Sequence, residues 1–514
     1  MVTKYVAGDG TGDYDADGTD DQDIINYALN WAADNPGNRI HLTGPFQYDI
    51  SDKILIGSST IFSGDLDAVL RLNDDCLWAV GVPVIGQIGG AGTATHDVEI
   101  YGFEVDLNQA NLYHAGTDRI HGKGYYNTIH IQGSSSSPAS NIHIHDLYAH
   151  DGLGDGPRLT YVNSISVHDC TLYDLMHASI FCVDCETIDI FDNDIKQISD
   201  AGVRFDNCRQ GNIYRNNITD WLGATYAPKG GAYGIQIGNQ PATYGHTALT
   251  TNINIYNNYI QSGACGVELE DYLQTAGATP QNVHVYNNLL TNCGWTNWAA
   301  YFSGISLYCW GNGVVIEYNT IDNAYRAGIL ITNAISSGTA ANVRYNNIIN
   351  TVRSGGDGGY GIWNKVPLDF SIVAEYNYLT NNISGNYLNV TPVSELAEYL
   401  ATAIPIVSVD PAHTDFIRVV SSMGMYAAEP TFLATPYTDE KDIEDGDQGL
   451  MLPTADGYTF QKFESPRVGQ KALIYPAHSR GEYYLLRIAE TVEDGQEVIA
   501  VPDKNGNYWP ILTK

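Results

Sequence analysis

The chain has 514 residues, with 59 Asp and Glu against 25 Lys and Arg, which gives a formal net charge of −34. This excess of negative charge repels phosphate backbones and anionic membranes, so nucleic acid is excluded as an expected partner. Hydrophobic residues make up 44% of the chain, enough for a large core, and no apolar run approaches the ~18 residues of a membrane span.

Residues 1–40 are predicted to close the N-terminal end of the fold. The N-terminus lacks the charged and then apolar pattern of a secretory leader, so we expect either an absent leader or export within a virus particle. Alternating carboxylates suggest a structural calcium ion bound by Asp13, Asp15, Asp17 and Asp21. The alternative is an acidic turn that caps the next helix. That helix is predicted over residues 20–35, with an apolar face of Ile24, Ile25, Ala28, Leu29 and Ala32.

A repeat runs through residues 41–430. Each copy alternates apolar and polar residues, ends in an Asn or Asp pair, and is followed by a second string that begins with Gly, as at Gly202, Gly234 and Gly266. The aligned positions recur at a short interval that loop insertions lengthen in some copies, and they are Asp146, Asp169, Asp192, Asn216, Asn257, Asn287, Tyr318, Asn346 and Tyr376. Strands of period two at this spacing indicate a parallel β-solenoid. The Asn residues are predicted to tolerate left-handed turns and to bond from coil to coil as a structural ladder.

Four cysteines lie within the repeat: Cys170, Cys182, Cys185 and Cys208. The Cys182-x-x-Cys185 spacing is compatible with a metal site. However, Cys185 and Cys208 are separated by one copy of the repeat at its shortest length. We therefore predict buried thiols stacked on adjacent coils instead.

The C-terminal part differs in composition. We predict a short helix at residues 394–401, a last coil that begins at Asp410, an acidic linker at 431–448 and a small β domain at 449–514. Hairpin turns are expected at 479–481 and 504–507. The predicted fold class is therefore all-β, a solenoid with an N-terminal capping helix and a small C-terminal β domain.

The larger, N-terminal part resembles a known family in four stretches, which are residues 5–29, 50–65, 122–131 and 150–207. There the chain is similar to the disaggregatase-related family of methanogenic archaea. The resemblance covers residues 5–430 and implies a right-handed parallel β-helix of the pectin-lyase-like type. It also implies cleavage of an acidic, amino-sugar-containing matrix polysaccharide (methanochondroitin), and thus an extracellular, cell-surface or virion-associated protein.

In β-helix polysaccharide enzymes the substrate lies along the strand that follows the ladder turn, which here is the Gly-initiated string. Positions two and four after the glycine are predicted to face solvent. The first column then contains His130, Arg158, Phe181, Arg204, Gln236, Glu268, Ser306, Leu330 and Trp363. The second column includes Asp206, Glu270 and Tyr308.

Carboxylates along these columns suggest glycoside hydrolysis. The catalytic candidates are Asp155, His177, Asp200, Asp206, Glu268 and Glu270. Asp206 and Glu270 stand two coils apart, or roughly 9–10 Å at strand spacing, near the upper limit for an inverting pair. Asp155 or Asp200, from the preceding loops, could replace either member. The alternative is an acidic outer face without catalysis.

His177 lies in the turn before its strand. Where the family has Gly-His-Asp-Gly around its histidine, this chain has Met176 to Ser179 around His177. The histidine is kept but its acidic neighbour is not, which leaves a base, an orienting group or a structural histidine open.

Elimination is the competing chemistry. Arg158 and Arg204 could neutralise a uronate carboxylate, unless they pair with nearby aspartates. His177 could then remove a proton and Tyr308 could return one. The sequence leaves both mechanisms open, and hydrolysis is favoured because carboxylates outnumber basic candidates.

Aromatic rings can serve as platforms for sugars. The predicted substrate-binding residues are His130, Arg158, Arg204, Gln236, Trp298, Tyr308, Trp310 and Trp363. No cofactor is required for either mechanism. A non-catalytic glycan adhesin and a viral tailspike-like homotrimer are the alternative functions.

Overall fold

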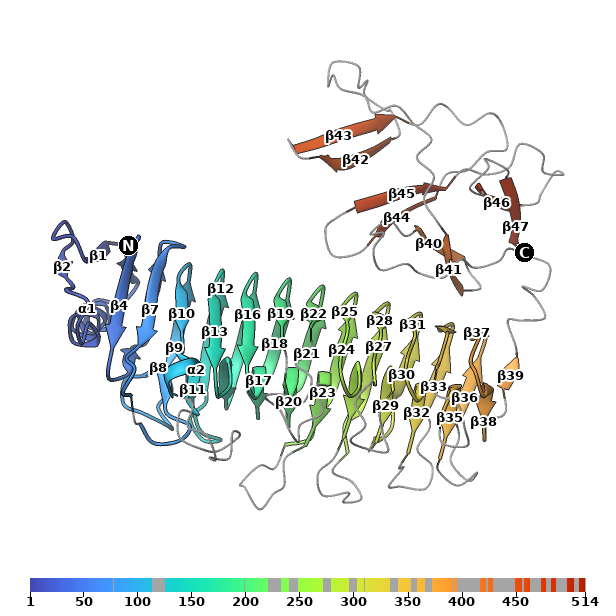
Figure 1. Cartoon of the computed structure of the whole chain (residues 1–514), viewed down its shortest axis with the longest axis horizontal. Coiled ribbons are helices and arrows are strands. Elements are labelled where there is room, and N and C mark those ends of the chain that lie inside the picture. The colour runs from blue at the N-terminus through green and yellow to red at the C-terminus, as the bar shows by residue number, and fades with distance from the viewer. Residues whose placement is uncertain are drawn as a thin grey trace.

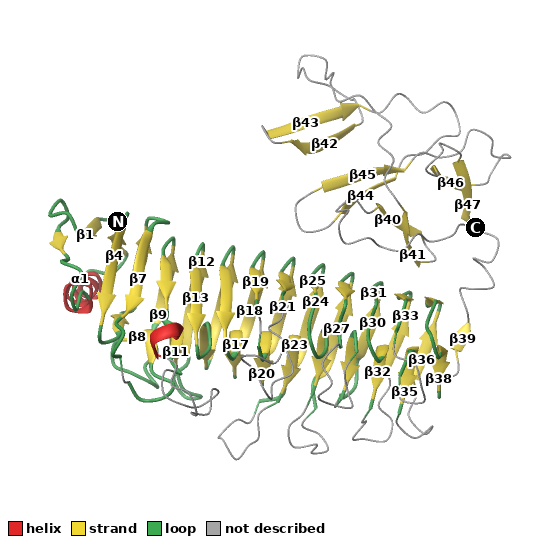
Figure 2. Cartoon of the chain, in the orientation of Figure 1, coloured by secondary structure: helices red, strands yellow, loops and turns green. Residues whose placement is uncertain are grey.

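The computed structural model describes two parts of the chain (Figures 1 and 2). The larger part spans residues 1–394, apart from residues 77, 113–124, 198, 221–232, 240–247, 271–278, 295–302, 309, 333–340, 353–357, 366–371 and 391. The smaller part consists of strands between residues 417 and 513. Within these residues, no helix is long and apolar enough to cross a membrane.

The larger part is a parallel β-solenoid in which each coil visits three sheets in turn (Figure 1). In spatial order, sheet A contains β2 (Tyr14–Asp15), β1 (Thr3–Ala7), β3 (Asn38–Leu42), β6 (Thr60–Gly64), β9 (His96–Tyr101), β12 (Ala139–His145), β15 (Val162–His168), β18 (Glu186–Phe191), β21 (Arg209–Tyr214), β24 (Thr251–Tyr256), β27 (Gln281–Tyr286), β30 (Val314–Glu317), β33 (Ala341–Arg344), β36 (Ile372–Glu375) and β39 (Pro392–Ser394).

Sheet B contains β4 (Phe46–Ile50), β7 (Ala68–Leu72), β10 (Glu104–Asp106), β13 (Tyr148–Gly152), β16 (Thr171–Leu175), β19 (Asp194–Lys196), β22 (Asn217–Thr219), β25 (Tyr259–Ile260), β28 (Leu289–Thr291), β31 (Thr320–Asp322), β34 (Asn347–Ile349) and β37 (Tyr378–Thr380). Sheet C contains β5 (Ile54–Ile56), β8 (Pro83–Gln87), β11 (Asn127–Gln132), β14 (Pro157–Thr160), β17 (Ala178–Val183), β20 (Ala201–Asp206), β23 (Tyr233–Gly238), β26 (Val267–Leu269), β29 (Ile305–Leu307), β32 (Ala327–Ile331), β35 (Tyr360–Asn364) and β38 (Gly385–Leu388). The predicted parallel solenoid is confirmed.

The core lies inside the coils and follows the period of two. In β18, for example, Ile188 and Ile190 are buried, while Asp189 and Phe191 between and after them are not fully buried. Aliphatic residues from the coils above and below continue the same core from Val6 to Leu379. From β20 to β35, glycine stands second in each sheet C strand or just before it, because a β-carbon there would collide with the next coil; at Gly202 it would lie 2.7 Å from the Gly234 carbonyl oxygen.

A helix closes the N-terminal end of this core, as the sequence predicts. Helix α1 (Gln22–Asp34) buries Ile25, Ala28, Leu29 and Ala32 against the first strands. Ile24 is partly buried and packs on the same core. The open apolar end of the first coil is therefore covered. A second, four-residue helix, α2 (Gln109–Leu112), lies beside β13.

The asparagine ladder forms, but in two adjacent columns instead of one. The buried column contains Asn193, Asn216, Asn258, Asn288, Asn319, Asn346 and Asn377, and each Oδ1 after the first accepts bonds from the backbone and side-chain amides of the preceding asparagine. The left-handed backbone falls one residue earlier, at positions such as Asn257, Asn287 and Tyr318. The left-handed turn and the hydrogen bonds from coil to coil are therefore provided by different residues, because the left-handed residue directs its side chain away from the core.

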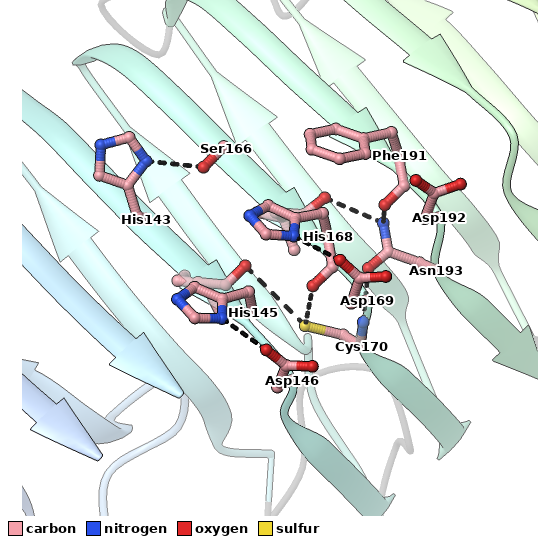
Figure 3. Close-up of polar contacts among 12 residues, drawn as sticks. His143, His145, Asp146, Ser166, His168, Asp169, Cys170, Phe191, Asp192 and Asn193 are labelled. Atoms are coloured by element: carbon pink, nitrogen blue, oxygen red, sulfur yellow. Dashed lines mark hydrogen bonds and ion pairs between the residues drawn. The ribbon is translucent and has the colours of Figure 1, made fainter. Parts of the chain in front are cut away.

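Figure 3 shows where the ladder starts and how Cys170 fits beside it. Asn193 Nδ2 donates to the Val167 and Phe191 carbonyl oxygens, and its Oδ1 accepts from the Cys170 backbone amide. The Cys170 thiol lies 3.3 Å from the His168 carbonyl oxygen. Cys182, Cys185 and Cys208 are likewise free, buried thiols on neighbouring coils, as predicted.

The described C-terminal strands pair as antiparallel hairpins. They are β40 (Ile417–Ser421) with β41 (Gly424–Ala428), β42 (Gly449–Thr454) with β43 (Gly457–Lys462), β44 (Leu473–Ala477) with β45 (Glu482–Leu486), and β46 (Glu497–Pro502) with β47 (Tyr508–Thr513). The last two enclose the predicted turns at 479–481 and 504–507. The predicted last coil from Asp410 is wrong, because its strand β40 pairs antiparallel with β41 and, among the described strands, joins no parallel sheet. Most of the predicted helix at 394–401 and the linker at 431–448 lie outside the described residues.

Candidate functional site

The candidate site lies along the outer side of sheet C. Matching positions of successive strands hold His130, Arg158, Phe181, Arg204, Gln236, Glu268, Ser306, Leu330 and Trp363. This is the column that the repeat predicts, residue for residue. Asp206 pairs with Gly238 in the second column.

The prediction that these columns face solvent is wrong for most of their residues. Only 4% of Arg204, 1% of Asp206 and 3% of Glu268 is exposed. Each side chain has neighbours one coil away on both sides, at the ~4.8 Å spacing of strands. The guanidinium carbons of Arg158 and Arg204, from the coils on either side, lie 4.8 and 5.0 Å from the centre of the Phe181 ring. The side chains of this column therefore pack against one another along the outer side of sheet C, and most of them are shielded from solvent.

Asp155 anchors the first part of the site. Its carboxylate accepts bonds from His177 Nδ1 at 2.5 Å, from Arg158 Nη1 at 2.9 Å and from the Ala178 amide at 3.1 Å. Burial alone raises the pKa of Asp155, but the charges of His177 and Arg158 and these bonds outweigh it and hold that pKa well below its usual range. Because Asp155 is fully buried, the predicted direct catalytic role is not supported, and Asp155 positions His177.

His177 stands between two carboxylates. Its other ring nitrogen, Nε2, lies 3.4 Å from Asp200 Oδ2, and 13% of its side chain is exposed. Burial lowers the pKa of His177, but Asp155 and Asp200 outweigh that effect and raise it. A raised pKa favours the imidazolium, which can orient Asp200 or donate a proton but cannot accept one.

Both arginines are paired with aspartates, which is the alternative that the sequence left open. Arg204 Nε lies 3.0 Å from Asp206 Oδ2, and its Nη1 lies 3.7 Å from Asp200 Oδ2. Arg158 pairs with Asp155. The side chain of Arg158 is 29% exposed and that of Arg204 only 5%, so Arg158 is the more accessible cation of the two.

Two glutamates follow on a later coil. Glu268 accepts from Gln236 Nε2 at 3.2 Å, and its carboxyl group interacts electrostatically with that of Glu270. Burial raises the pKa of Glu268 well above its usual range and that of Glu270 to about 7. Glu270 is partly exposed whereas Glu268 is buried. Glu270 is therefore the accessible member of a pair that holds a proton near neutral pH.

Asp206 approaches Glu270 across a glycine. A β-carbon at Gly238 would lie 2.8 Å from Asp206 Oδ1 and 3.7 Å from Glu270 Cγ. These two atoms are therefore closer together than the roughly 9–10 Å expected from strand spacing. Asp206 is too deeply buried to meet a substrate directly. Its charge contributes to the raised pKa of Glu270, as does that of the more exposed Asp200.

The four aromatic residues predicted to bind substrate divide into three groups. Trp310 is fully buried in the solenoid core, and Trp363 is 6% exposed and packs with Ala327 and Leu330, so neither offers a face to a sugar. Their indole rings are large apolar surfaces that the coils bury. Tyr308 is partly exposed. Trp298 lies outside the described residues.

His130 closes the N-terminal side of the column. Its Nε2 lies 3.2 Å from the Thr160 hydroxyl, and its side chain is partly buried. Burial and then the charge of Arg158 lower the pKa of His130 to about 3. His130 is therefore neutral near pH 7 and offers a substrate hydrogen bonds without charge.

The carboxylates of Asp13 and Asp21, two of the four N-terminal aspartates, have separate partners in the described residues. Asp13 pairs with Lys4 at 2.6 Å, and Asp21 Oδ1 accepts from the backbone amides of Asp17 and Gly18. Asp21 stands at the helix N-cap but makes no side-chain capping bond there, so its carboxylate stabilises the preceding turn instead. Calcium binding by this segment, including Asp15, stays a prediction.

Two tyrosines belong to the site but escaped the sequence analysis. Tyr125 Oη donates to Asp155 Oδ2 at 3.4 Å, and its ring meets that of His177 edge to face at 5.8 Å. Tyr233 packs against the clusters around Phe181 and Cys265, and burial together with Glu268 raises its pKa. Neither follows the two-residue periodicity after the glycine, which is the signal in the sequence that predicts the columns.

Three parallel sheets around one core, with a layer of charged side chains along sheet C, define the chain as a right-handed parallel β-helix protein. Residues 250–403 match the model of the family described as "Disaggregatase related". This match supports the resemblance noted in the sequence, and it lies outside the four stretches that first suggested it. No curated protein matches the chain.

Solved structures agree on the fold. The A-module of mannuronan C-5 epimerase AlgE4 from Azotobacter vinelandii superimposes with a TM-score of 0.52 at 13% identity, over 76% of this chain and 99% of that one. The Family 28 exopolygalacturonase of Yersinia enterocolitica gives a TM-score of 0.46 at 11% identity, over 76% and 79% of the two chains. The tailspike of E. coli bacteriophage HK620, in complex with a pentasaccharide, gives 0.47 at 13% identity, over 71% and 63%.

Proposed function

We propose that the protein is a depolymerase of an acidic, amino-sugar-containing surface or matrix polysaccharide of the methanochondroitin type, and that it acts by glycoside hydrolysis. The observation that carries this proposal is the pair Glu268–Glu270, in which the accessible Glu270 has its pKa raised to about 7 by burial. The match to the Disaggregatase related family and the likeness to a mannuronan epimerase support the choice of substrate class.

Glu270 serves as the general acid. A carboxyl group that keeps its proton near pH 7 can transfer it to the glycosidic oxygen as the bond from that oxygen to the anomeric carbon breaks. Glu268 and Asp206 do not meet the substrate. Burial first, and then the charges of Asp206 and Asp200, keep the proton on Glu270, whereas Glu268 acts in the opposite direction.

Asp200 serves as the general base. Its side chain is 18% exposed, and it lies between His177 Nε2 and Arg204 Nη1, two cationic groups that orient it. It accepts a proton from the water that attacks the anomeric carbon. Bond cleavage, water addition and both proton transfers then balance, and one new reducing end forms per cut.

Hydrolysis is favoured over elimination by the state of the basic groups. Elimination needs a free cation against the uronate carboxylate and a neutral base for the C5 proton. Arg204 is buried against two aspartates, and His177 is held between two carboxylates that raise its pKa. Arg158, the more exposed arginine, remains suited to bind a uronate carboxylate without taking part in the chemistry.

The decisive experiment incubates the full chain with a uronate-containing matrix polysaccharide and records reducing ends and ultraviolet absorbance together. Hydrolysis predicts new reducing ends without an absorbing double bond, and a loss of about 10²–10⁴-fold in turnover for Glu270→Gln. Asp200→Asn is expected to behave alike. The matched control is Asp189→Asn on the outer side of sheet A, where the carboxylate accepts from Asn212 at 2.9 Å; its turnover should not change.

Other outcomes would replace the proposal. Absorbance that rises in step with reducing ends means β-elimination and moves the chemistry to His177 and Arg158. Saturable binding without either signal means a glycan adhesin. A trimeric mass in solution would favour a tailspike-like, virion-associated protein, and we expect the polysaccharide to be met outside the cell or at its surface in every case.

A further inference from the structure

The turn after sheet B carries a column of side chains on the outside of the solenoid. Its residues have left-handed backbones, and they are Asp151, Asp174, Gln197, Asp220, Asn292, Asn323, Asn350 and Asn381. In the later coils these side chains satisfy one another, because Asn323 Nδ2 donates to Asn292 Oδ1 at 2.6 Å and Asn381 Nδ2 to Asn350 Oδ1 at 3.3 Å. An amide can both donate and accept, so an asparagine column needs no other partner.

The first two members of the column are carboxylates instead. Asp151 and Asp174 occupy facing positions on adjacent coils, between the pairs His150–Tyr173 and Gly152–Leu175. Ionised carboxylates only accept hydrogen bonds, and like charges at strand spacing repel. In the later coils the side chains of this column therefore hydrogen-bond to one another. At Asp151 and Asp174 two carboxylates face each other and their charges repel.

More ligand atoms converge on this point from the preceding coil. Oxygen atoms of Asp106 and Asp151 and a ring nitrogen of His150 lie within 4.8 Å of one another, the one such group among the described residues. His150 also lies 3.1 Å from Glu104 Oε1, and Arg71 Nε lies 3.4 Å from Asp106 Oδ2. The group thus combines an imidazole with several carboxylates and one arginine at its edge.

Asp174 provides the independent observation. It is only 9% exposed, and its Oδ1 has no hydrogen-bond partner within the described chain. Its position faces that of Asp151 on the preceding coil, because the flanking residue pairs are His150–Tyr173 and Gly152–Leu175. A buried carboxylate with an unsatisfied oxygen costs free energy unless a cation faces it.

We propose that Asp106, His150, Asp151 and Asp174 form a binding site for a divalent transition-metal cation. Imidazole together with carboxylates suits Zn²⁺ or Mn²⁺, whereas a site for Ca²⁺ would be built from oxygen ligands alone. The site joins β10, β13 and β16, so the cation would bind three successive coils together just before the turns that carry Asp155 and His177. Its role is to position that part of the chain, and it takes no part in the proposed reaction.

The test titrates Zn²⁺, Mn²⁺ and Ca²⁺ separately into the chelator-treated full chain, with calorimetry and thermal unfolding as readouts. We expect one saturable Zn²⁺ or Mn²⁺ site, and a loss of affinity of at least about tenfold in Asp151→Asn and in Asp174→Asn. Each variant removes one negative charge from a cluster of neighbouring carboxylates and so reduces their repulsion. We therefore expect both variants to fold. Metal-free Asp174→Asn should unfold at a higher temperature than the parent chain.

The matched control is His145→Gln. His145 is held between Asp146 and Glu99 as His150 is held between Asp151 and Glu104, but no further carboxylate completes a group around it within the described residues. Its variant should keep full affinity, whereas His150→Gln should lose it. The proposal is overturned if neither Zn²⁺ nor Mn²⁺ binds saturably, or if binding survives in both aspartate variants.

Discussion

The outer columns of sheet A and sheet C run along the same coils with the same register, yet they differ in what they repeat. On sheet A the rings of Tyr101, His145, His168, Phe191, Tyr214, Tyr256 and Tyr286 stack with centroids 4.6 to 5.0 Å apart. On sheet C the residue type changes at almost every coil, from Arg158 to Phe181 to Arg204 to Gln236 to Glu268.

We infer from this difference that the sheet A column serves packing alone, whereas the sheet C column also serves the chemistry of the site. A column of similar flat rings is a low-energy solution for neighbours held at strand spacing, and any coil can continue it. A column that buries alternating cations, carboxylates and an amide gains nothing from repetition and must satisfy each group individually. Residues in the first kind of column are expected to affect stability alone, and residues in the second kind to affect stability and turnover.

The largest effect on stability is expected where the sheet C side is most buried. Asp155→Asn leaves the charges of His177 and Arg158 without their carboxylate and should destabilise the fold by about 3–5 kcal/mol. Urea unfolding measures this. The matched control is Asp169→Asn, whose 52% exposed carboxylate pairs with His168 on the sheet A side and should cost less than about 1 kcal/mol. Equal losses in the two variants would contradict the electrostatic description of the site.

The interior ladder should come next. Asn258 Nδ2 donates to the Ile213 and Tyr256 carbonyl oxygens and to Asn288. Asn258→Ala leaves buried partners unsatisfied and should cost about 2–4 kcal/mol in the same unfolding assay. Asn254→Ala removes a half-buried amide that bonds to Asn212, so a loss below about 1 kcal/mol is expected from it.

A smaller effect of opposite sign is expected at Glu270. Its pKa is about 7 in the folded chain against an ordinary value of 4.5. Between these pH values the folded chain keeps a proton that the unfolded chain has lost, so stability falls as pH rises from 4.5 to 7 and stays lower above. Glu270→Gln has no such loss and should be more stable by roughly 1–3 kcal/mol at pH 8, with the advantage vanishing near pH 4.5.

The control for this pH dependence is Glu186→Gln. That glutamate pairs with Arg209 on the surface of sheet A, so its variant should differ from the parent chain by less than about 0.5 kcal/mol. A Glu270→Gln curve that runs parallel to the parent curve from pH 4.5 to 8 would show that burial does not hold a proton on Glu270.

The smallest effect on stability is expected from substitutions of one aromatic ring in each column, and these test the difference between the two columns directly. Tyr214 stacks between Phe191 and Tyr256, and Phe181 lies between Arg158 and Arg204. Tyr214→Leu and Phe181→Leu should each cost about 1 kcal/mol of stability. Only Phe181→Leu should lower polysaccharide turnover, because it releases the arginines that hold the aspartates of the site. Turnover lost in both variants, or in neither, would remove the distinction between the two columns.

The repeat in the sequence was enough to predict the solenoid, the capping helix and the composition of the sheet C column. Local patterning determines these features, since a period of two together with Gly-initiated strings places each residue inside or outside its coil. The sequence also suggested a sugar platform at Trp310, whereas that ring lies in the core. It further assigned one column of asparagines to two tasks that Asn258 and Asn257 divide between them.

Burial outside the coils could not be predicted, because it depends on contacts between different coils and on segments far apart in sequence. Asp155 was identified as a candidate, but nothing in its neighbourhood indicated that it would be fully buried beneath His177 and Tyr125. Similarly, Asp106 and Asp174 belong to coils that are not adjacent in the chain, and only the register of β10, β13 and β16 brings them to one place.

The capping helix has a consequence for how the chain is made. Helix α1 packs on β1, β3, β5 and β6, and the last of these strands ends at Gly64. The first coil can therefore fold while the rest of the protein is still being synthesised. Each later coil can then form hydrogen bonds to the strands of the coil before it, which are already folded. Ribosome-bound chains that end after successive coils should acquire protease resistance one coil at a time, beginning at the N-terminus.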